Sequence, residues 1–175
     1  GAKRNAASPV PVLGFPEISM LGMYPWGGFG ANPQPDELER YWKEFRASKG
    51  TILGGWSYSE GIFEDLNKVI LAQLYWDPDR PVWDIVREYA ACEFGRALAD
   101  DVVGIIRTLE ANHRLRLNPE STSEDEWIAA DDPAAEEAYE IARNVNEKLA
   151  QSARESWRWR IIYLRTLLDA ELKSN

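Results

Sequence analysis

Residues 62–110, IFEDLNKVILAQLYWDPDRPVWDIVREYAACEFGRALADDVVGIIRTLE, indicate the fold class, because their apolar residues recur with the period of an α-helix. The chain changes character just before this stretch, near Gly61. Of the 12 glycines, 10 lie at or before Gly61, and six of the 10 prolines lie before Asp36. Glycine and proline interrupt helices rather than extend them. We therefore expect loops and short extended segments in the first third, and helices after it.

Helical periodicity and breaker residues together predict the individual elements. Thr51–Gly55 is a short apolar run ending in two glycines, which suits a buried strand followed by a sharp turn. The predicted fold is mainly α, a bundle of four to six helices with an irregular Gly-, Pro- and aromatic-rich N-terminal third. Residues 1–56 would be the irregular segment, a remnant of a barrel end, and residues 57–175 the helical domain. Helices are expected over residues 36–49, 57–76, 79–94, 97–115 and 133–172, the last either broken near 150–153 or continuous.

Capping signals predict where three of these helices begin. Ser57 and Glu60 have the spacing of a capping box. Asp79 can cap the next helix, with Pro81 in its first turn. Asp132 followed by Pro133 has the same arrangement before the acidic helix.

The last helical segment carries an apolar stripe that predicts its buried face. Trp157 and Trp159 are two residues apart and cannot both face one core, so one of them should lie at an interface or on the surface. Helices between residues 133 and 172 would then offer a surface for a homodimer or for a neighbouring domain. The predicted stripe consists of Trp157, Ile161, Leu164, Leu168 and Leu172.

The charge distribution argues against two classes of partner. The net charge is −9, and residues 119–142 hold nine carboxylates without one Lys or Arg. This run is typical of a solvated loop and a helix N-terminus. A chain without a basic stripe would repel the phosphates of nucleic acid and of anionic membranes. The sequence also has no run of about 18 apolar residues, the length that a membrane span needs.

The amino-acid composition and motifs give little support for a metal site or a nucleotide-binding site. The single histidine, His113, and the single cysteine, Cys92, cannot build a zinc site, and we expect no metal or cofactor. His113 is interpreted as a core or edge histidine and Cys92 as a buried, inert thiol. The GGFG run at residues 27–30 lacks the Lys-Ser/Thr of a phosphate-binding loop, so it is interpreted as a turn.

Aromatic residues near the glycine-rich loops are candidate sugar-binding residues. Trp and Tyr rings can stack on the C–H faces of a sugar while the sugar hydroxyls keep their hydrogen bonds. The alternative is that these rings cover the bundle or a neighbouring part of the protein. The candidates are Tyr24, Trp26, Trp56 and Tyr58.

Two carboxylates are candidate catalytic groups. Glu60 follows the predicted strand at 51–55 and its double-glycine turn, and Glu17 follows Gly14-Phe15-Pro16 in a similar setting. Barrel enzymes carry working groups at the carboxyl ends of strands. Glycoside hydrolysis needs two carboxylates about 5–9.5 Å apart. Glu60 also completes the capping box with Ser57, so a purely structural role stays open.

Several segments resemble one family. GGWSYSEGIFEDLNKVILAQLYWDPDRPVWDIVREYAACEFG (54–95), with its core YSEGIFEDLNK (58–68) and the turn LYWDP (74–78), is similar to the end of the barrel in large bacterial glycoside-hydrolase-like proteins. These are loosely related to family 20 hexosaminidases and α-glucuronidases. SWRWRIIYLRTLLDAEL (156–172) resembles their helical domain, and FPEISMLGMYPWGGFGAN (15–32) resembles a loop at the barrel mouth.

The resemblance implies that this chain is a C-terminal piece, consisting of the last barrel elements and a helical domain. The catalytic Asp-Glu pair of family 20 hexosaminidases lies upstream of the final strands, so the piece would be inactive alone. The upstream barrel would then complete a pocket for an oligosaccharide or polysaccharide. This chain would contribute Trp56, Tyr58 and Glu60 to the lining of that pocket. The alternative is a non-enzymatic helical interaction or oligomerisation module.

Overall fold

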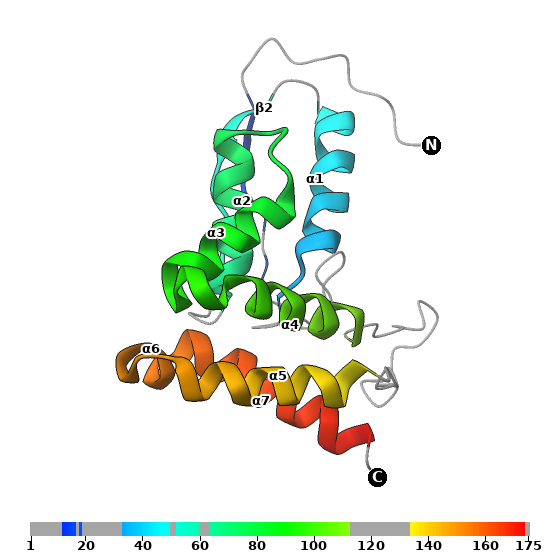
Figure 1. Cartoon of the computed structure of the whole chain (residues 1–175). Helices are drawn as coiled ribbons and strands as arrows, with labels where there is room; N and C mark the ends of the chain where they lie inside the picture. Colours follow the sequence, from blue (N-terminus) through cyan, green and yellow to red (C-terminus); the bar gives the residue numbers. More distant parts are fainter. Residues whose placement is uncertain are drawn as a thin grey trace.

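A computed structural model describes residues 12–16, 18, 33–49, 52–59, 64–112 and 134–173, and it is mainly helical, as predicted (Figure 1). These residues hold six helices of 12 to 17 residues and one short helix of five. In chain order the elements are β1 (Val12–Gly14), α1 (Pro35–Lys49), β2 (Ile52–Gly55), α2 (Asp65–Trp76), α3 (Val82–Phe94), the 3₁₀ turn η1 (Arg96–Leu98), α4 (Ala99–Asn112), α5 (Ala134–Lys148), α6 (Gln151–Glu155) and α7 (Trp157–Lys173).

The helices form two groups joined by α4. In Figure 1, α1, α2 and α3 lie in the upper part beside the two strands, and α5, α6 and α7 lie in the lower part. Helix α4 crosses between the groups and packs against α3 on one side and against α5 and α7 on the other. The chain therefore has one continuous core, and α4 is its centre.

The two strands are parallel neighbours, so the first third is more regular than expected. Leu13 pairs with Gly54 and Gly14 with Gly55, and the register is irregular between Val12 and Leu13. Helix α1 connects the strands and α2 follows β2, which is the β–α–β–α order of α/β proteins. A strand is thus confirmed at Ile52–Gly55, but the expected burial and sharp turn are wrong: Leu53 is exposed, and backbone pairing keeps the chain extended as far as Tyr58.

Two glycines allow α2 to lie directly on the sheet. A Cβ atom at Gly14 or Gly55 would overlap the ring of Tyr75, which projects from α2. The Tyr75 hydroxyl is buried without a hydrogen-bond partner in the described residues. Burial, with a smaller contribution from Tyr41, raises the pKa of Tyr75 to about 12, so the phenol stays neutral. The helix side of the sheet is therefore closed.

The core follows the predicted apolar faces of the middle helices. Each of α2, α3 and α4 buries a stripe with helical spacing, as the sequence pattern indicated, and α5 adds small residues that let it approach α4 closely. The fully buried predicted positions include Ile70, Leu74, Ile85, Val86, Val102, Ile105, Ile106, Leu109, Ala142 and Val145.

Helix α7 presents a different face to the core from the one predicted. Trp159, Ile162 and Thr166 are buried, whereas Leu164 and Leu168 are exposed, so the predicted inward stripe is wrong at those two positions. Trp159 sets this rotation, because its ring packs edge-on against Phe94 at 5.5 Å, and its Nε1 donates a hydrogen bond to a side chain of α5. The expectation that only one tryptophan of the 157/159 pair enters the core is confirmed.

The start predicted for α2 is wrong. Ser57 and Tyr58 are extended, because the Tyr58 N–H donates to the Pro16 carbonyl at 2.8 Å and the Tyr58 carbonyl accepts from the Ile18 N–H at 3.0 Å. The helix begins only at Asp65. Ser57 therefore caps no helix, and its hydroxyl is buried without a partner in the described residues.

Three further expectations can be compared with the structure. Helix α3 begins at Val82 rather than at Asp79, whose carboxylate instead accepts a hydrogen bond from Arg46 at 2.6 Å. Cys92 is exposed, not buried, because it lies on the outer side of α3. The break near 150–153 is confirmed, since α5 ends at Lys148 and two further helices follow. His113 and the Asp132-Pro133 start lie outside the described residues.

Candidate functional site

The candidate site lies where the two parallel strands end. Because β1 and β2 run in the same direction, residues 15, 16 and 18 and residues 56–59 leave the sheet at the same edge. Backbone hydrogen bonds continue the pairing past the strands, beginning with the Trp56 N–H to the Gly14 carbonyl at 3.1 Å. In open and closed α/β sheets, ligands bind outside this carboxyl edge.

Three aromatic rings gather there, and we call them the aromatic platform: Phe15, Trp56 and Tyr58. The Phe15 ring lies 5.5 Å from the Trp56 ring, nearly perpendicular to it, and 5.5 Å from the Tyr58 ring. Phe15 is 57% exposed, Trp56 59% and Tyr58 40%, which is unusual for three neighbouring large rings. The platform is therefore a ready surface for another flat, partly apolar group.

The platform occupies the face of the sheet that α2 does not cover. Gly14 and Gly55 face Tyr75 on the helix side, and alternation along a strand turns Phe15 and Trp56 to the opposite side. Leu13, two residues before Phe15, is also exposed, as is Leu53. This face is thus apolar along its length, although parallel sheets are normally covered on both faces.

The structure brings together only part of the predicted site. Trp56 and Tyr58 each contact the same ring, that of Phe15, so the structure gathers these two predicted residues at one edge. The sequence did not identify Phe15 as a member of the site. Phe15 reaches the other two rings only because β1 pairs with β2, and β2 begins at Ile52, 38 residues after β1 ends at Gly14. The other predicted site residues, Glu17, Tyr24, Trp26 and Glu60, lie outside the described residues.

A buried polar cluster follows the platform in the chain, and it too was not predicted. Glu64 is buried and accepts a hydrogen bond from the Ser59 hydroxyl at 2.6 Å. The buried Asn67 accepts one from the Gln34 backbone N–H at 3.1 Å, and the Gln34 Nε2 is buried without a partner in the part of the chain that the structure describes. Hydroxyl, amide and carboxylate groups are the usual partners of sugar hydroxyls. No sequence spacing points to this cluster, since it joins residues on both sides of α1 and β2.

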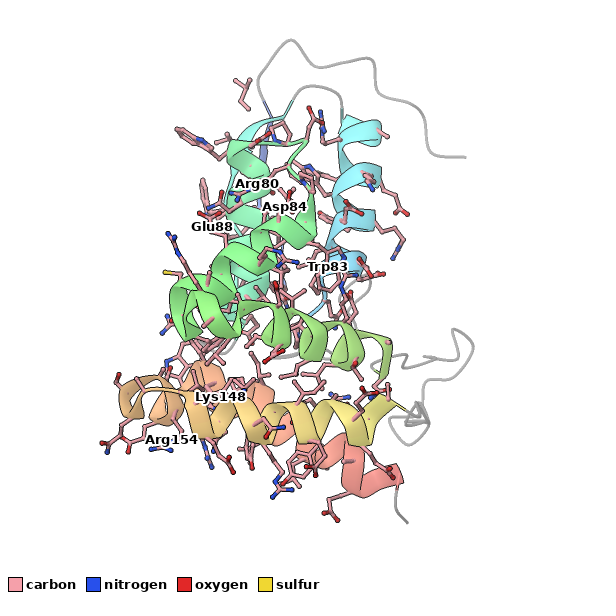
Figure 2. All side chains as sticks on the ribbon, in the orientation of Figure 1. Arg80, Trp83, Asp84, Glu88, Lys148 and Arg154 are labelled. Atoms are coloured by element: carbon pink, nitrogen blue, oxygen red, sulfur yellow. The ribbon has the colours of Figure 1, made fainter. Side chains whose placement is uncertain are left out.

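The carboxylate of Glu110 has a perturbed pKa and a structural role. Glu110 of α4 accepts hydrogen bonds at 3.1 Å from the backbone N–H groups of Asp36 and Glu37, so it caps α1. Burial raises the pKa of Glu110 from 4.5 to about 7, against the lowering effect of those two donors. Trp83, labelled in Figure 2, donates to the Asp36 carboxylate at 2.7 Å and packs under Arg107. These contacts fasten α1 to α3 and α4.

Other kinds of site find no support in the described ranges. Among residues 12–16, 18, 33–49, 52–59, 64–112 and 134–173, no three His, Cys, Asp or Glu side chains are grouped closely enough to hold a metal ion. No helix within these ranges combines the length and apolarity of a bilayer span.

Comparisons of this chain with protein-family models, with curated proteins and with solved structures gave no significant match. The resemblance to glycoside-hydrolase-like proteins therefore stays a prediction. The case for a function depends on the geometry of the sheet edge.

Proposed function

We propose that this chain is the C-terminal part of a carbohydrate-handling protein of the glycoside-hydrolase type. In this proposal the β1–α1–β2–α2 order contributes the last two units of a β/α barrel, and the aromatic platform lines its sugar-binding mouth. The observation that carries the proposal is the exposed contact of Phe15, Trp56 and Tyr58 at the carboxyl ends of two parallel strands.

The position of the apolar residues along the strands supports this arrangement. Leu13 precedes Phe15 by two residues and shares its face, so an aliphatic side chain lies lower on the open face and rings lie at its carboxyl edge. A β/α barrel has the same division, with branched aliphatic side chains filling the interior and functional groups at the carboxyl mouth. The upstream barrel strands would cover the lower part and leave the rings accessible.

The rings suit the chemistry of a sugar ligand. A pyranose ring offers C–H groups on its faces and hydroxyls around its rim, so it can stack on Trp56 or Tyr58 without losing its hydrogen bonds to water or protein. Binding through this platform would favour oligosaccharides with flat, exposed ring faces.

Glu60 is assigned an acid/base role or a contact with a substrate hydroxyl, and it acts in the full-length parent. It directly follows Ser59, whose hydroxyl the structure places against Glu64. Replacing Glu60 with Gln in the parent should strongly lower turnover of its glycoside substrate. Unchanged turnover with a lower melting temperature would leave Glu60 a structural role alone.

The binding proposal is tested by titrating the chain with a panel of linear oligosaccharides. Tryptophan emission and calorimetry should show binding to the wild type, and Trp56→Ala should weaken it about fivefold or more, since stacking on one ring contributes roughly 1 kcal/mol or more. Trp76→Ala is the matched control, because Trp76 is 88% exposed at the far end of α2 and outside the platform. A flat response across the panel, or equal losses in the two variants, would remove the proposal.

A second candidate function is a helical self-association module, favoured by one observation. Leu164 and Leu168 lie one turn apart on α7 and are both exposed, so they form an apolar ridge that a second copy of the chain could cover. Light scattering over a range of concentrations tests it. A monomer at every concentration would rule out this role.

A further inference from the structure

The first turn of α2 is held by a residue from the far end of the chain. The Arg158 Nε, at the start of α7, donates to Asp65 Oδ2 at 2.6 Å, and an Arg158 terminal nitrogen lies 3.4 Å from Asp65 Oδ1. Asp65 is the first residue of α2. This pair bridges 93 residues of sequence and joins the lower helical group to the element that follows the candidate site.

Two residues of α3 complete the contact, and we call Asp65, Tyr89, Glu93 and Arg158 the Asp65 cluster. The Tyr89 hydroxyl donates to Asp65 Oδ2 at 3.0 Å, and the Glu93 carboxylate lies 3.6 Å from the Arg158 Nε. Burial and the neighbouring Asp65 carboxylate raise the pKa of Tyr89, so its hydroxyl stays a donor. Asp65 and Arg158 are each less than one third exposed, so water screens this pair less than a surface pair.

The same turn is bonded to the end of β2. Glu64, next to Asp65 in the chain, accepts the 2.6 Å hydrogen bond from the Ser59 hydroxyl. Ser59 follows Tyr58. The Tyr58 backbone N–H and carbonyl are hydrogen-bonded to Pro16 and Ile18, just past the end of β1. A continuous series of contacts therefore runs from Arg158 through Asp65, Glu64 and Ser59 to the platform residue Tyr58.

We propose that Arg158 is a positioning residue: by holding Asp65, α7 fixes the start of α2 and, through the Glu64–Ser59 hydrogen bond, sets the orientation of the aromatic platform. The C-terminal helices then stabilise the sheet edge as well as the core. The alternative is that Arg158 merely helps α7 to dock. This inference does not require the platform to bind a sugar.

Hydrogen exchange on the intact chain separates the two roles. Arg158→Ala should raise the exchange of amides over residues 56–66 by about tenfold, while amides in the centre of α3 and α4 keep their protection. Arg143→Ala is the matched control, since Arg143 pairs only with Glu140 on its own helix among the contacts described, and it should leave the 56–66 amides unchanged.

Two milder variants keep the test decisive if Arg158→Ala unfolds. Arg158→Lys keeps the charge but loses the forked contact, and Tyr89→Phe removes one donor to Asp65; each should raise exchange over residues 56–66 by a smaller, local amount. Unchanged exchange over 56–66 in a folded Arg158 variant, or a uniform rise along the whole chain, would overturn the inference. A failed sugar titration with a local exchange effect would overturn the proposed function and leave the inference standing.

Discussion

The strand region and the helical bundle of this protein handle aromatic residues in opposite ways. In the bundle, Trp159 is fully buried, in contact with Phe94 and Tyr163, and its ring nitrogen is bonded to Asn146. At the sheet, Phe15 contacts both Trp56 and Tyr58, but each of the three rings leaves 40% or more of its surface in solvent. Clustering of rings is common to both regions, and coverage is not.

The degree of burial distinguishes the aromatic rings of the core from those of the platform. The bundle closes on itself because α4 packs against helices of both groups. Within the described residues, α2 covers one face of the sheet, and the other face carries the exposed apolar side chains of Leu13, Phe15, Trp56 and Tyr58. Stability should therefore reside in the bundle, whereas recognition should reside at the sheet. Four predictions examine this contrast, in order of decreasing effect.

The largest effect is expected from Trp159→Ala. Removing this ring leaves a cavity beside Phe94 and orphans the Asn146 amide oxygen, so the free energy of unfolding should fall by about 3–5 kcal/mol. Urea denaturation measures it. Trp76→Ala is the control and should stay within about 0.5 kcal/mol, because Trp76 is almost fully exposed. Similar losses in both variants would contradict the assigned core.

Glu110 should make the stability of the bundle depend on pH. The folded chain keeps the Glu110 proton up to about pH 7, whereas the unfolded chain releases it near pH 4.5. Between these values the folded state binds more protons, so the free energy of unfolding should fall as pH rises, by up to about 3 kcal/mol.

Denaturation of the wild type and of Glu110→Gln at several pH values measures this effect. The variant cannot titrate at this position, so its stability should vary less between pH 4.5 and 7. Parallel pH profiles for the two proteins would show that Glu110 has an ordinary pKa.

Gly55→Ala should separate α2 from the sheet. The added Cβ would overlap the Tyr75 ring and the Gly14 carbonyl, so we expect a loss of about 1–3 kcal/mol in the free energy of unfolding. Gly104→Ala is a sharp control, because nothing lies near its new Cβ on α4, and it should gain about 0.5–1 kcal/mol. A neutral Gly55→Ala would mean that the sheet does not hold α2 closely.

The smallest effect on stability is expected from Trp56→Ala. Its ring is mostly exposed and loses one edge contact with Phe15, so the free energy of unfolding should change by about 1 kcal/mol or less. The same denaturation experiment as for Trp159→Ala measures it. A loss as large as that of Trp159→Ala would make the platform part of the core rather than a binding surface.

Local patterns predicted the helices well and their boundaries less well. The stripe that runs from Leu98 in η1 to Leu109 in α4 is buried, as its 3.6-residue period indicated. The capping box at Ser57 failed, because backbone hydrogen bonds to Pro16 and Ile18, past the end of β1, hold Tyr58 extended where the local signal favours a helix. A four-residue pattern reflects local preference only, so it carries no information about the backbone hydrogen bonds of Tyr58 to Pro16 and Ile18, much earlier in the chain.

The candidate site was predicted only in part for a similar reason. Trp56 and Tyr58 stood out because they are aromatic and follow a glycine turn, a property of neighbouring residues. Phe15 joins them through strand pairing, and Glu64 acquires its burial through the start of α2. Neither the strand pairing nor the burial can be inferred from the spacing of residues along the chain.

The amino-acid sequence was sufficient to establish that the chain is mainly helical and which residues form the centre of its core, because helical periodicity is a short-range property. Folding in three dimensions settled which face of α7 turns inward, that β1 and β2 are parallel partners, and that three rings share one open edge. Each of those outcomes depends on contacts between residues far apart in the chain, such as Trp159 with Phe94 and Phe15 with Trp56, where packing and backbone pairing outweigh local preference.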